Sequence, residues 1–203
     1  MKRIELEPGQ LSPHFFGRWT IESLALCDEL VRFFETHQAN HTKGRTGGGL
    51  NTESKNSIDM AIRPRDLEQP DHEPVRNYIA TLFECYKDYL TQWPFLKSML
   101  ENAEIGSFNI QKYEPGGHFM KLHSERTTVE TAHRVLAWMT YLNDVDDGGS
   151  THFEHQGLEV KPEKGKTLIW PGEWTHAHKG NVVNSGLKYI ITGWMHLPPY
   201  ASP

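Results

Sequence analysis

The sequence has few cysteines, no long apolar run and no excess of positive charge. Its two cysteines, Cys27 and Cys85, are too few for a disulfide framework and match no zinc-ligand spacing. No apolar run approaches the length of a membrane span, and residues 1–16 lack the apolar region of a secretory signal. We therefore expect a cytoplasmic protein with no membrane partner.

The charge balance excludes a further class of partner. The 203-residue chain carries 26 acidic against 21 basic side chains, a formal net charge of −5. Proteins that bind nucleic acid neutralise phosphates with clustered Lys and Arg, so we expect no nucleic-acid partner. Histidine, in contrast, is abundant: there are 12, and eight of them lie between His118 and His196.

Two stretches of the first half have the apolar periodicity of helices. Residues 20–37 predict one helix, with Thr20 as its N-cap, and residues 71–93 predict a second, with Pro74 in its first turn. Between them, residues 43–57 (KGRTGGGLNTESKNS) are glycine-rich and polar, which predicts a loop.

From Glu104 onward the pattern changes to short strands separated by turn signals such as EPGG, NDVDDGG and PEKG. Many short strands at close spacing predict an antiparallel jelly roll or barrel. We therefore expect a mainly β fold with N-terminal helices. A single domain over 1–203 would have a helical part at about 1–100 and a β core at about 104–198. The expected strands are EIGSFNIQKYE, HFMKLHSE, HRVLAWMTYLN, STHFEH, LEVK, KTLIWP and GLKYIITGWMHL.

Histidines and an acid recur at a spacing that suits a metal. His123 and Glu125 stand two apart in KLHSE, and His176 and His178 stand two apart in WTHAHKG, at the end of another expected strand. Side chains two apart on a strand share a face. Two histidines and one carboxylate form the facial triad of non-haem Fe(II) oxygenases. An H-x-E pair also occurs by chance on surfaces, and strand facing does not choose between His176 and His178.

The order of the surrounding motifs is more specific. FNIQKYEPGGHFMKLHSE is followed by HRVLAWMTYLNDVDDGGSTHFE, then VKPEKGKTLIWP, then HKGNVVNSGLKYIITGW. In this combination the chain resembles the 2-oxoglutarate- and Fe(II)-dependent dioxygenases, in their prolyl-4-hydroxylase-like branch. The resemblance implies a double-stranded β-helix, a form of jelly roll, in agreement with the strand pattern.

The resemblance also implies a metal site. Its first two ligands would be His123 and Glu125, with Glu125 standing where the branch normally has aspartate. A glutamate is still an anionic oxygen ligand, and the presence of a carboxylate argues against the related halogenases. The family places a basic anchor nine or ten residues after its distal histidine. Lys188 lies ten residues after His178 and twelve after His176, so the third ligand would be His178. His176 would then position that ligand or line the entrance.

The remaining site residues follow from the same resemblance. Lys188 would pair with the distal carboxylate of 2-oxoglutarate, Thr192 would add a hydrogen bond, and Tyr113 and Tyr141 would contact the same co-substrate. Each tyrosine is equally well explained as a packed aromatic side chain. The implied cofactors are Fe(II), 2-oxoglutarate as co-substrate and O2, with ascorbate as a further expectation.

The expected function is hydroxylation of an unactivated C–H bond, such as that of a prolyl residue, with release of succinate and CO2. The substrate would be a peptide or a small molecule, and the same chemistry on a free amino acid or other metabolite is one alternative. A non-catalytic cupin-like metal-binding module is another. The 43–57 segment would be a substrate lid or a plain surface loop. The sequence leaves the oligomeric state open.

Overall fold

The computed structural model describes residues 14–197. The ends of the expected 1–203 domain therefore lie outside the described residues, as does most of the N-terminal segment in which no secretory signal was found. Within the described part, no helix is both long and apolar enough to cross a membrane.

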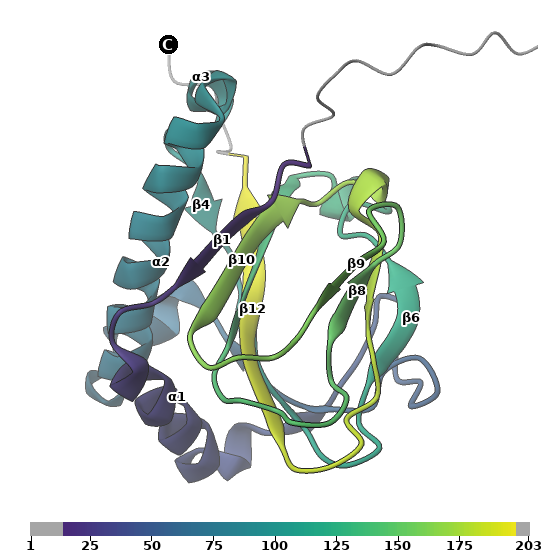
Figure 1. Cartoon of the computed structure of the whole chain (residues 1–203). Helices are drawn as coiled ribbons and strands as arrows, with labels where there is room; N and C mark the ends of the chain where they lie inside the picture. The colour runs from purple at the N-terminus through teal and green to yellow at the C-terminus, as the bar shows by residue number, and fades with distance from the viewer. Residues whose placement is uncertain (1–13, 198–203) are drawn as a thin grey trace, which may run out of the picture.

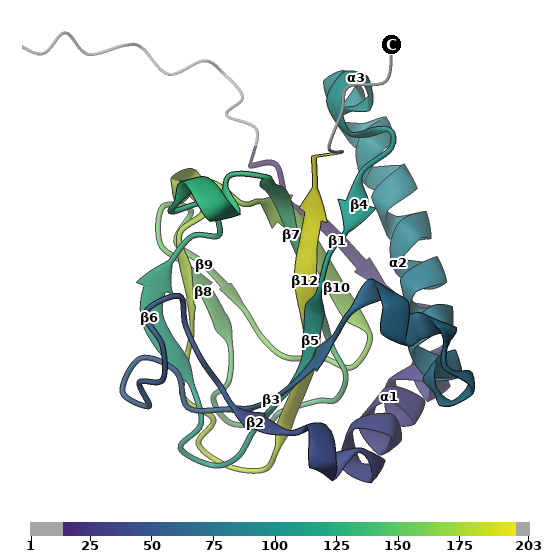
Figure 2. The same cartoon turned by 180° about the vertical axis from the view of Figure 1, so that it is seen from behind.

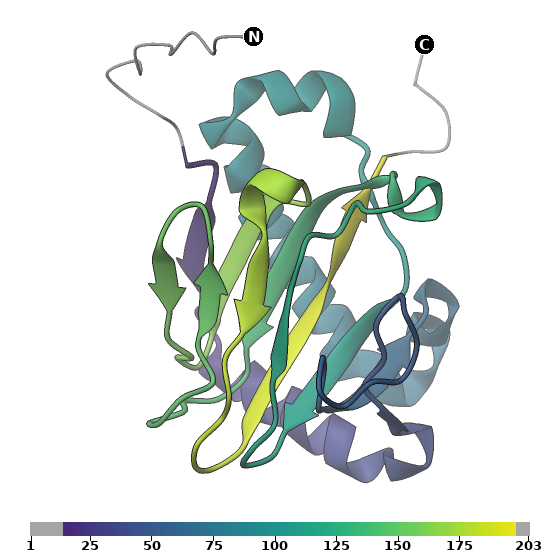
Figure 3. The ribbon, with the colours of Figure 1, turned by 90° about the vertical axis from the view of Figure 1, so that its right-hand side faces the viewer.

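Two antiparallel sheets face each other (Figures 1 and 3). The major sheet has the order β1-β10-β7-β12-β5-β3-β2, with β4 also pairing with β12. The minor sheet has the order β6-β11-β8-β9. The major-sheet strands are β1 (Gly17–Thr20), β2 (Thr42–Lys43), β3 (Ile58–Ile62), β4 (Glu104–Ile105), β5 (Phe108–Tyr113), β7 (Arg134–Tyr141), β10 (Lys166–Pro171) and β12 (Lys188–His196). The minor-sheet strands are β6 (Phe119–His123), β8 (Thr151–Phe153), β9 (Leu158–Val160) and β11 (His178–Gly180).

This arrangement is the predicted jelly roll. Every segment expected to form a strand from Glu104 onward does so, although EIGSFNIQKYE is divided into β4 and β5. The turns between strands use glycine where the backbone requires it. Gly148 and Gly149 have φ values of 79° and 68°, in the left-handed region that other residues rarely adopt. They turn the chain between β7 and β8.

The two long helices cover the outer face of the major sheet (Figures 1 and 2). The α-helices are α1 (Leu24–Thr36), α2 (Glu73–Gln92) and α3 (Lys97–Leu100). Short 3-10 helices are η1 (Gln38–Asn40), η2 (Pro64–Glu68), η3 (Pro70–His72), η4 (Pro94–Leu96), η5 (Val129–Thr131) and η6 (Trp174–His176). As predicted, α2 begins with Pro74 in its first turn.

Each face of the major sheet has its own apolar core. Side chains of α1 and α2, including Leu30 and Tyr78, pack against Trp138 on one face. Between the two sheets, Phe153 and Trp170 belong to a second cluster. The major sheet is thus covered on one side by helices and on the other by the minor sheet. The second cluster lies in the space between the two sheets.

The start of the first helix was predicted wrongly. Thr20 does not cap a helix: it is the last residue of β1 and pairs with Lys166 of β10. The helix begins at Leu24, after Ser23. The cause is tertiary, because GRWT adds an edge strand to the major sheet, and a backbone hydrogen bond from Ile21 N to Gly165 O (3.0 Å) extends that pairing.

The N-terminal part is also not purely helical. It contributes β1, β2 and β3 to the major sheet, and β3 pairs with β5 over its whole length. In β3 the buried Met60 and Ile62 pack with the helical core, whereas Asp59, next to Met60 in the sequence, faces the interior cavity. The helical part and the β core are therefore interleaved, and the assignment to a single domain stays a prediction.

Candidate active site

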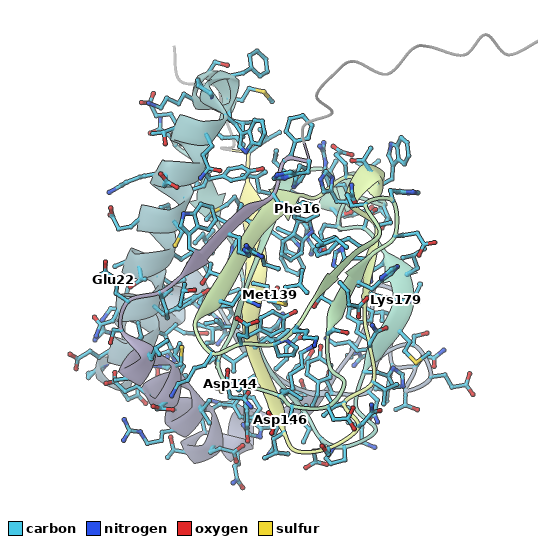
Figure 4. The ribbon with its side chains drawn as sticks, in the orientation of Figure 1. Phe16, Glu22, Met139, Asp144, Asp146 and Lys179 are labelled. Carbon is cyan, nitrogen blue, oxygen red and sulfur yellow. The ribbon has the colours of Figure 1, made fainter. Side chains whose placement is uncertain are left out.

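A cavity of about 690 Å³ opens between the two sheets. Six of the expected site residues line it: His123, Glu125, His178, Lys188, Tyr113 and Thr192. The seventh, Tyr141, is fully buried and does not belong to the lining. In the view with side chains, Met139, another lining residue, lies in the middle of the molecule between the sheets (Figure 4).

His123, Glu125 and His178 meet in one place. His123 ends β6 and His178 begins β11, and the two are direct partners in the antiparallel register. Glu125 Oε1 lies 3.4 Å from His178 Nε2 and 3.9 Å from His123 Nε2. One ligand atom from each residue lies within 4.8 Å of the others, which is the spacing a single metal ion requires.

The two histidine rings are held in the same way. His123 Nδ1 lies 2.8 Å from Lys121 O, and His178 Nδ1 lies 2.9 Å from His176 O. A carbonyl oxygen only accepts, so Nδ1 must carry the proton in each ring and Nε2 must be free of one. Hydrogen bonds of this kind fix the tautomer and the orientation of metal-binding histidines. Both unprotonated nitrogens therefore face Glu125.

The environment of His123 keeps that ring neutral. Burial, followed by the neighbouring imidazole of His178, lowers the pKa of His123 to about 4. Only a neutral imidazole binds a metal ion. At pH 7 the ring is therefore ready to do so without losing a proton.

Glu125 is held by its backbone and by its side chain. Its N–H donates to Gly172 O at 3.1 Å, just past the end of β6. The indole Nε1 of Trp194 donates to Glu125 Oε2 at 2.6 Å. The indole therefore engages one carboxylate oxygen and leaves Oε1 facing the two histidines. This contact restrains the glutamate side chain, which is one methylene longer than that of aspartate.

The prediction of one strand carrying both His176 and His178 was wrong. His176 lies in η6, and β11 begins only at His178. The ring of His176 is buried, with Nε2 2.9 Å from His14 O and Nδ1 3.0 Å from Thr175 Oγ1. His176 reaches the site through its backbone carbonyl, which orients His178.

Lys188 is a buried base without an acidic partner among the described residues. Its side chain is only 3% exposed, and Nζ donates to Gly149 O at 2.5 Å. The amine lies 5.1 Å from the ring centre of Tyr113 and 5.5 Å from that of Tyr141. Burial lowers the pKa of Lys188 to about 7. An ammonium group has three donors, so this one has capacity for an anion that enters the cavity.

The other expected co-substrate residues differ in what they can offer. Tyr113 lines the cavity and donates its hydroxyl to Gln111 Oε1 at 2.6 Å. Thr192 lines the cavity and donates to Trp138 O at 2.8 Å, which leaves its oxygen able to accept. Tyr141 shares its hydroxyl with Thr151 Oγ1 at 2.7 Å. Tyr141 lies outside the cavity lining. Its ring packs beside the Lys188 amine and supports that side chain.

Sequence reasoning missed a buried ion pair beside the site. Lys55 Nζ lies 2.5 Å from Asp59 Oδ2, and the Ser57 hydroxyl donates to Asp59 Oδ1 at 2.7 Å. Lys55 also lies 5.3 Å from the ring centre of Phe119, which stacks on His123 at 4.0 Å. The available signal was Asp59 itself, an acid between the apolar Ile58 and Met60 in the stretch IDMAI.

The 43–57 segment borders the cavity, and several of its residues contribute to the lining. The Lys55–Asp59 pair fastens its end to β3, and Lys121 N donates to Ser54 O at 3.2 Å, which attaches it to β6. Its use as a substrate lid stays a prediction.

The chain is similar to known proteins, chiefly over its β core. Residues 108–196 match the family model described as the 2OG-Fe(II) oxygenase superfamily. Prolyl 4-hydroxylase subunit alpha-1 from Homo sapiens is 28% identical over 109 residues, which cover 49% of this chain and 20% of that protein. The chain thus spans only a small part of the curated relatives of this kind. The resemblance to the oxygenases, in their prolyl 4-hydroxylase branch, is confirmed.

Solved structures support the fold. A prolyl-4-hydroxylase from Pseudomonas putida superposes with a TM-score of 0.69 at 19% identity, covering 91% of this chain and 94% of that one. A prolyl hydroxylase from Trichoplax adhaerens, solved with a peptide fragment of the hypoxia inducible factor oxygen degradation domain, gives 0.69 at 15% identity, covering 90% and 84%. The double-stranded β-helix is therefore confirmed.

Proposed function

We propose that this chain, whose β core matches the 2OG-Fe(II) oxygenase superfamily, is an Fe(II)- and 2-oxoglutarate-dependent dioxygenase. It would hydroxylate an unactivated C–H bond and release succinate and CO2. The observation that carries the proposal is the pairing of two features in one cavity: a group of two histidines and one carboxylate, and a buried lysine that has no acidic partner within residues 14–197.

The donor set fits ferrous iron. Two neutral imidazole nitrogens and one carboxylate oxygen on one side of an ion form the facial triad and leave its other positions open. His123, Glu125 and His178 would hold the ion. When bound, Fe(II) supplies the reductive activation of O2 that drives decarboxylation and hydroxylation.

The remaining side chains would bind and orient the co-substrate. Lys188 pairs with the distal carboxylate, because an anion buried between the sheets needs a charge partner. Thr192 and Tyr113 flank that position from β12 and β5. The aromatic side chains that surround the cavity exclude water from the reacting atoms.

For the substrate we propose a prolyl residue of a peptide. The identity to prolyl 4-hydroxylase subunits and the likeness to a prolyl hydroxylase solved with a peptide support this choice. A free amino acid or another metabolite is the alternative, because the residues that surround the metal position do not depend on a peptide. Ascorbate would serve as the reductant that keeps the iron ferrous.

A non-catalytic cupin-like module is disfavoured by Lys188. A buried, unpaired lysine destabilises a fold, and a metal-binding module without co-substrate has no use for it. The test is succinate formation from 2-oxoglutarate, followed in air with Fe(II). We expect succinate from the native chain and none from the Glu125→Ala variant, which loses the anionic ligand. Absence of succinate from the native chain, tested over a panel of proline peptides and amino acids, would favour the binding module.

A further inference from the structure

Charge is distributed unevenly around the cavity. The chain as a whole is acidic, with a net charge of −5. The cavity lining nevertheless carries six basic side chains and only two acidic ones, Asp59 and Glu125. The basic ones are Lys43, Arg45, Lys55, Lys121, Arg134 and Lys188.

Neither acid is available to neutralise these bases. Asp59 already accepts from Lys55 at 2.5 Å and from Ser57 at 2.7 Å. Glu125 faces the two histidines and accepts from Trp194. Both carboxylates are therefore committed within the site.

Four of the bases form no ion pair with any described residue. They are Lys43, Arg45, Lys121 and Arg134, since Lys55 pairs with Asp59 and Lys188 is assigned to the co-substrate. The guanidinium of Arg134 lies 3.7 Å above the ring centre of Trp194, and its buried Nε has no acceptor among the described residues. Stacking holds this planar group in place, ready for a ligand oxygen.

The other three are exposed and line the cavity from two neighbouring segments. Lys43 ends β2 and Arg45 follows it, whereas Lys121 lies on β6. Figure 2 shows the segment after β2 passing beside β6, and a bridge between Asn56 and His118 joins the two. We call Lys43, Arg45 and Lys121 the basic rim.

We propose that the substrate is an acidic peptide segment, whose carboxylates contact the basic rim while Arg134 holds an oxygen close to the metal. The proposal rests on the proposed function, because it concerns the substrate of the same site. A metabolite small enough to lie inside the cavity would contact Arg134 but leave the exposed rim unused. An acidic peptide that crosses the opening would contact all three side chains of the basic rim.

The expected effect is moderate. Exposed ion pairs are individually weak, so the three rim contacts together should change affinity about tenfold at low salt. Added salt screens such contacts and should reduce the difference. Electrostatic complementarity of this kind selects between partners more than it raises affinity.

Two labelled peptides test the proposal: a proline flanked by Asp and Glu, and the same proline flanked by Lys. Binding to the full chain with Fe(II) and 2-oxoglutarate is measured by fluorescence anisotropy without O2, so that no turnover occurs. We expect the acidic peptide to bind about tenfold more tightly at low salt. The combined variant Lys43→Glu, Arg45→Glu, Lys121→Glu should reverse the preference.

The matched control for Lys121→Glu is Lys179→Glu, which makes the same change of charge on β11. Lys179 is not part of the cavity lining and lies beside the minor sheet (Figure 4). Lys121→Glu should weaken binding of the acidic peptide and Lys179→Glu should not.

The proposal would be overturned if Lys121→Glu and Lys179→Glu had equal effects on binding of the acidic peptide. It would also be overturned if the two peptides bound equally well, or if neither bound. So would tight binding of N-acetylglutamate that the combined rim variant leaves unchanged. Succinate formation is measured separately. Succinate without a preference for the acidic peptide removes this proposal alone. The preference without succinate removes the proposed function, and the cavity is then a binding site for acidic peptides and not a site that acts on them.

Discussion

The protonation of Lys188 depends on what enters the cavity. In the free protein burial lowers its pKa to about 7, whereas a lysine of the unfolded chain titrates near 10.4. Between pH 7 and about 10.4, Lys188 is protonated in the unfolded chain but largely unprotonated in the folded one. The free energy of unfolding therefore rises with pH over this range. Below pH 7 the lysine is charged in both states and its cost to the fold is fully present. A bound carboxylate would remove that cost.

The affinity for 2-oxoglutarate should therefore depend on pH. Binding should raise the pKa of Lys188 and take up a proton above pH 7. Affinity should be level below pH 7 and fall up to about tenfold per pH unit above it. Anaerobic titration calorimetry of the Fe(II)-loaded protein, in buffers of different ionisation enthalpy, measures both quantities.

Lys188→Arg is the matched control, because an arginine stays charged at every pH tested. Its affinity for 2-oxoglutarate, even if weaker, should lose this dependence. A native profile that does not change between pH 6 and 9, or an arginine variant with the same profile, would show that Lys188 is not the group that titrates.

The contact between Trp194 and Glu125 predicts a coupling between these two residues. Trp194→Phe keeps the ring beside Arg134 but removes the N–H donor, and should weaken Fe(II) or Co(II) binding about 10-fold, within the range for residues that orient metal ligands. In the Glu125→Asp background the shorter carboxylate should no longer reach the indole. Trp194→Phe should then have little further effect on metal affinity.

Anaerobic metal titrations of the native chain, the two single variants and the double variant complete this cycle. If Trp194→Phe weakens metal binding equally in both backgrounds, the indole acts through packing and does not orient the acid.

At the scale of elements, the strands of the β core were predictable and the edges of the sheet were not. Segments such as KTLIWP and GLKYIITGW are apolar runs between clear turn signals, and each forms the strand expected of it. GRWT at 17–20 has no such signal, because its strand exists only through pairing with β10. Likewise, WTHAHKG divides between η6 and β11, which local alternation does not reveal.

The Lys55–Asp59 pair predicts how the 43–57 segment is fastened to β3. Both side chains are buried, at 4% and 10% exposure. Lys55→Met leaves Asp59 as an unpaired buried acid and should lower the free energy of unfolding by about 3–5 kcal/mol. Replacing both, as Lys55→Met with Asp59→Leu, should restore much of the loss, because no buried charge then remains unpaired.

Urea denaturation of the two variants measures these free energies. The Lys87–Glu84 pair on α2 is exposed, at 68% and 71%, and its removal should cost less than about 1 kcal/mol. A Lys55→Met variant as stable as Lys87→Met would mean that the buried pair does not fasten the segment.

At the scale of the whole molecule, the sequence predicted the jelly roll and the meeting of residues far apart in the chain. His123 and His178 are 55 positions apart and become direct partners in the minor sheet. That prediction came from motif order, since local pattern alone carries no information on such pairing. The cationic lining was not predictable in the same way. Lys43, Lys121 and Arg134 come from three separate elements, and only the fold brings them to one cavity.

We propose that His123, Glu125 and His178 hold Fe(II) in the cavity where Lys188 binds 2-oxoglutarate. The most direct test is an anaerobic titration of Fe(II) into His178→Ala and His176→Ala with 2-oxoglutarate present, followed by the metal-to-ligand charge-transfer absorption. We expect the absorption in the native chain and in His176→Ala, because the backbone carbonyl of residue 176 still orients His178, and none in His178→Ala. An absorption that survives in His178→Ala and disappears in His176→Ala would show that His178 is not the metal ligand.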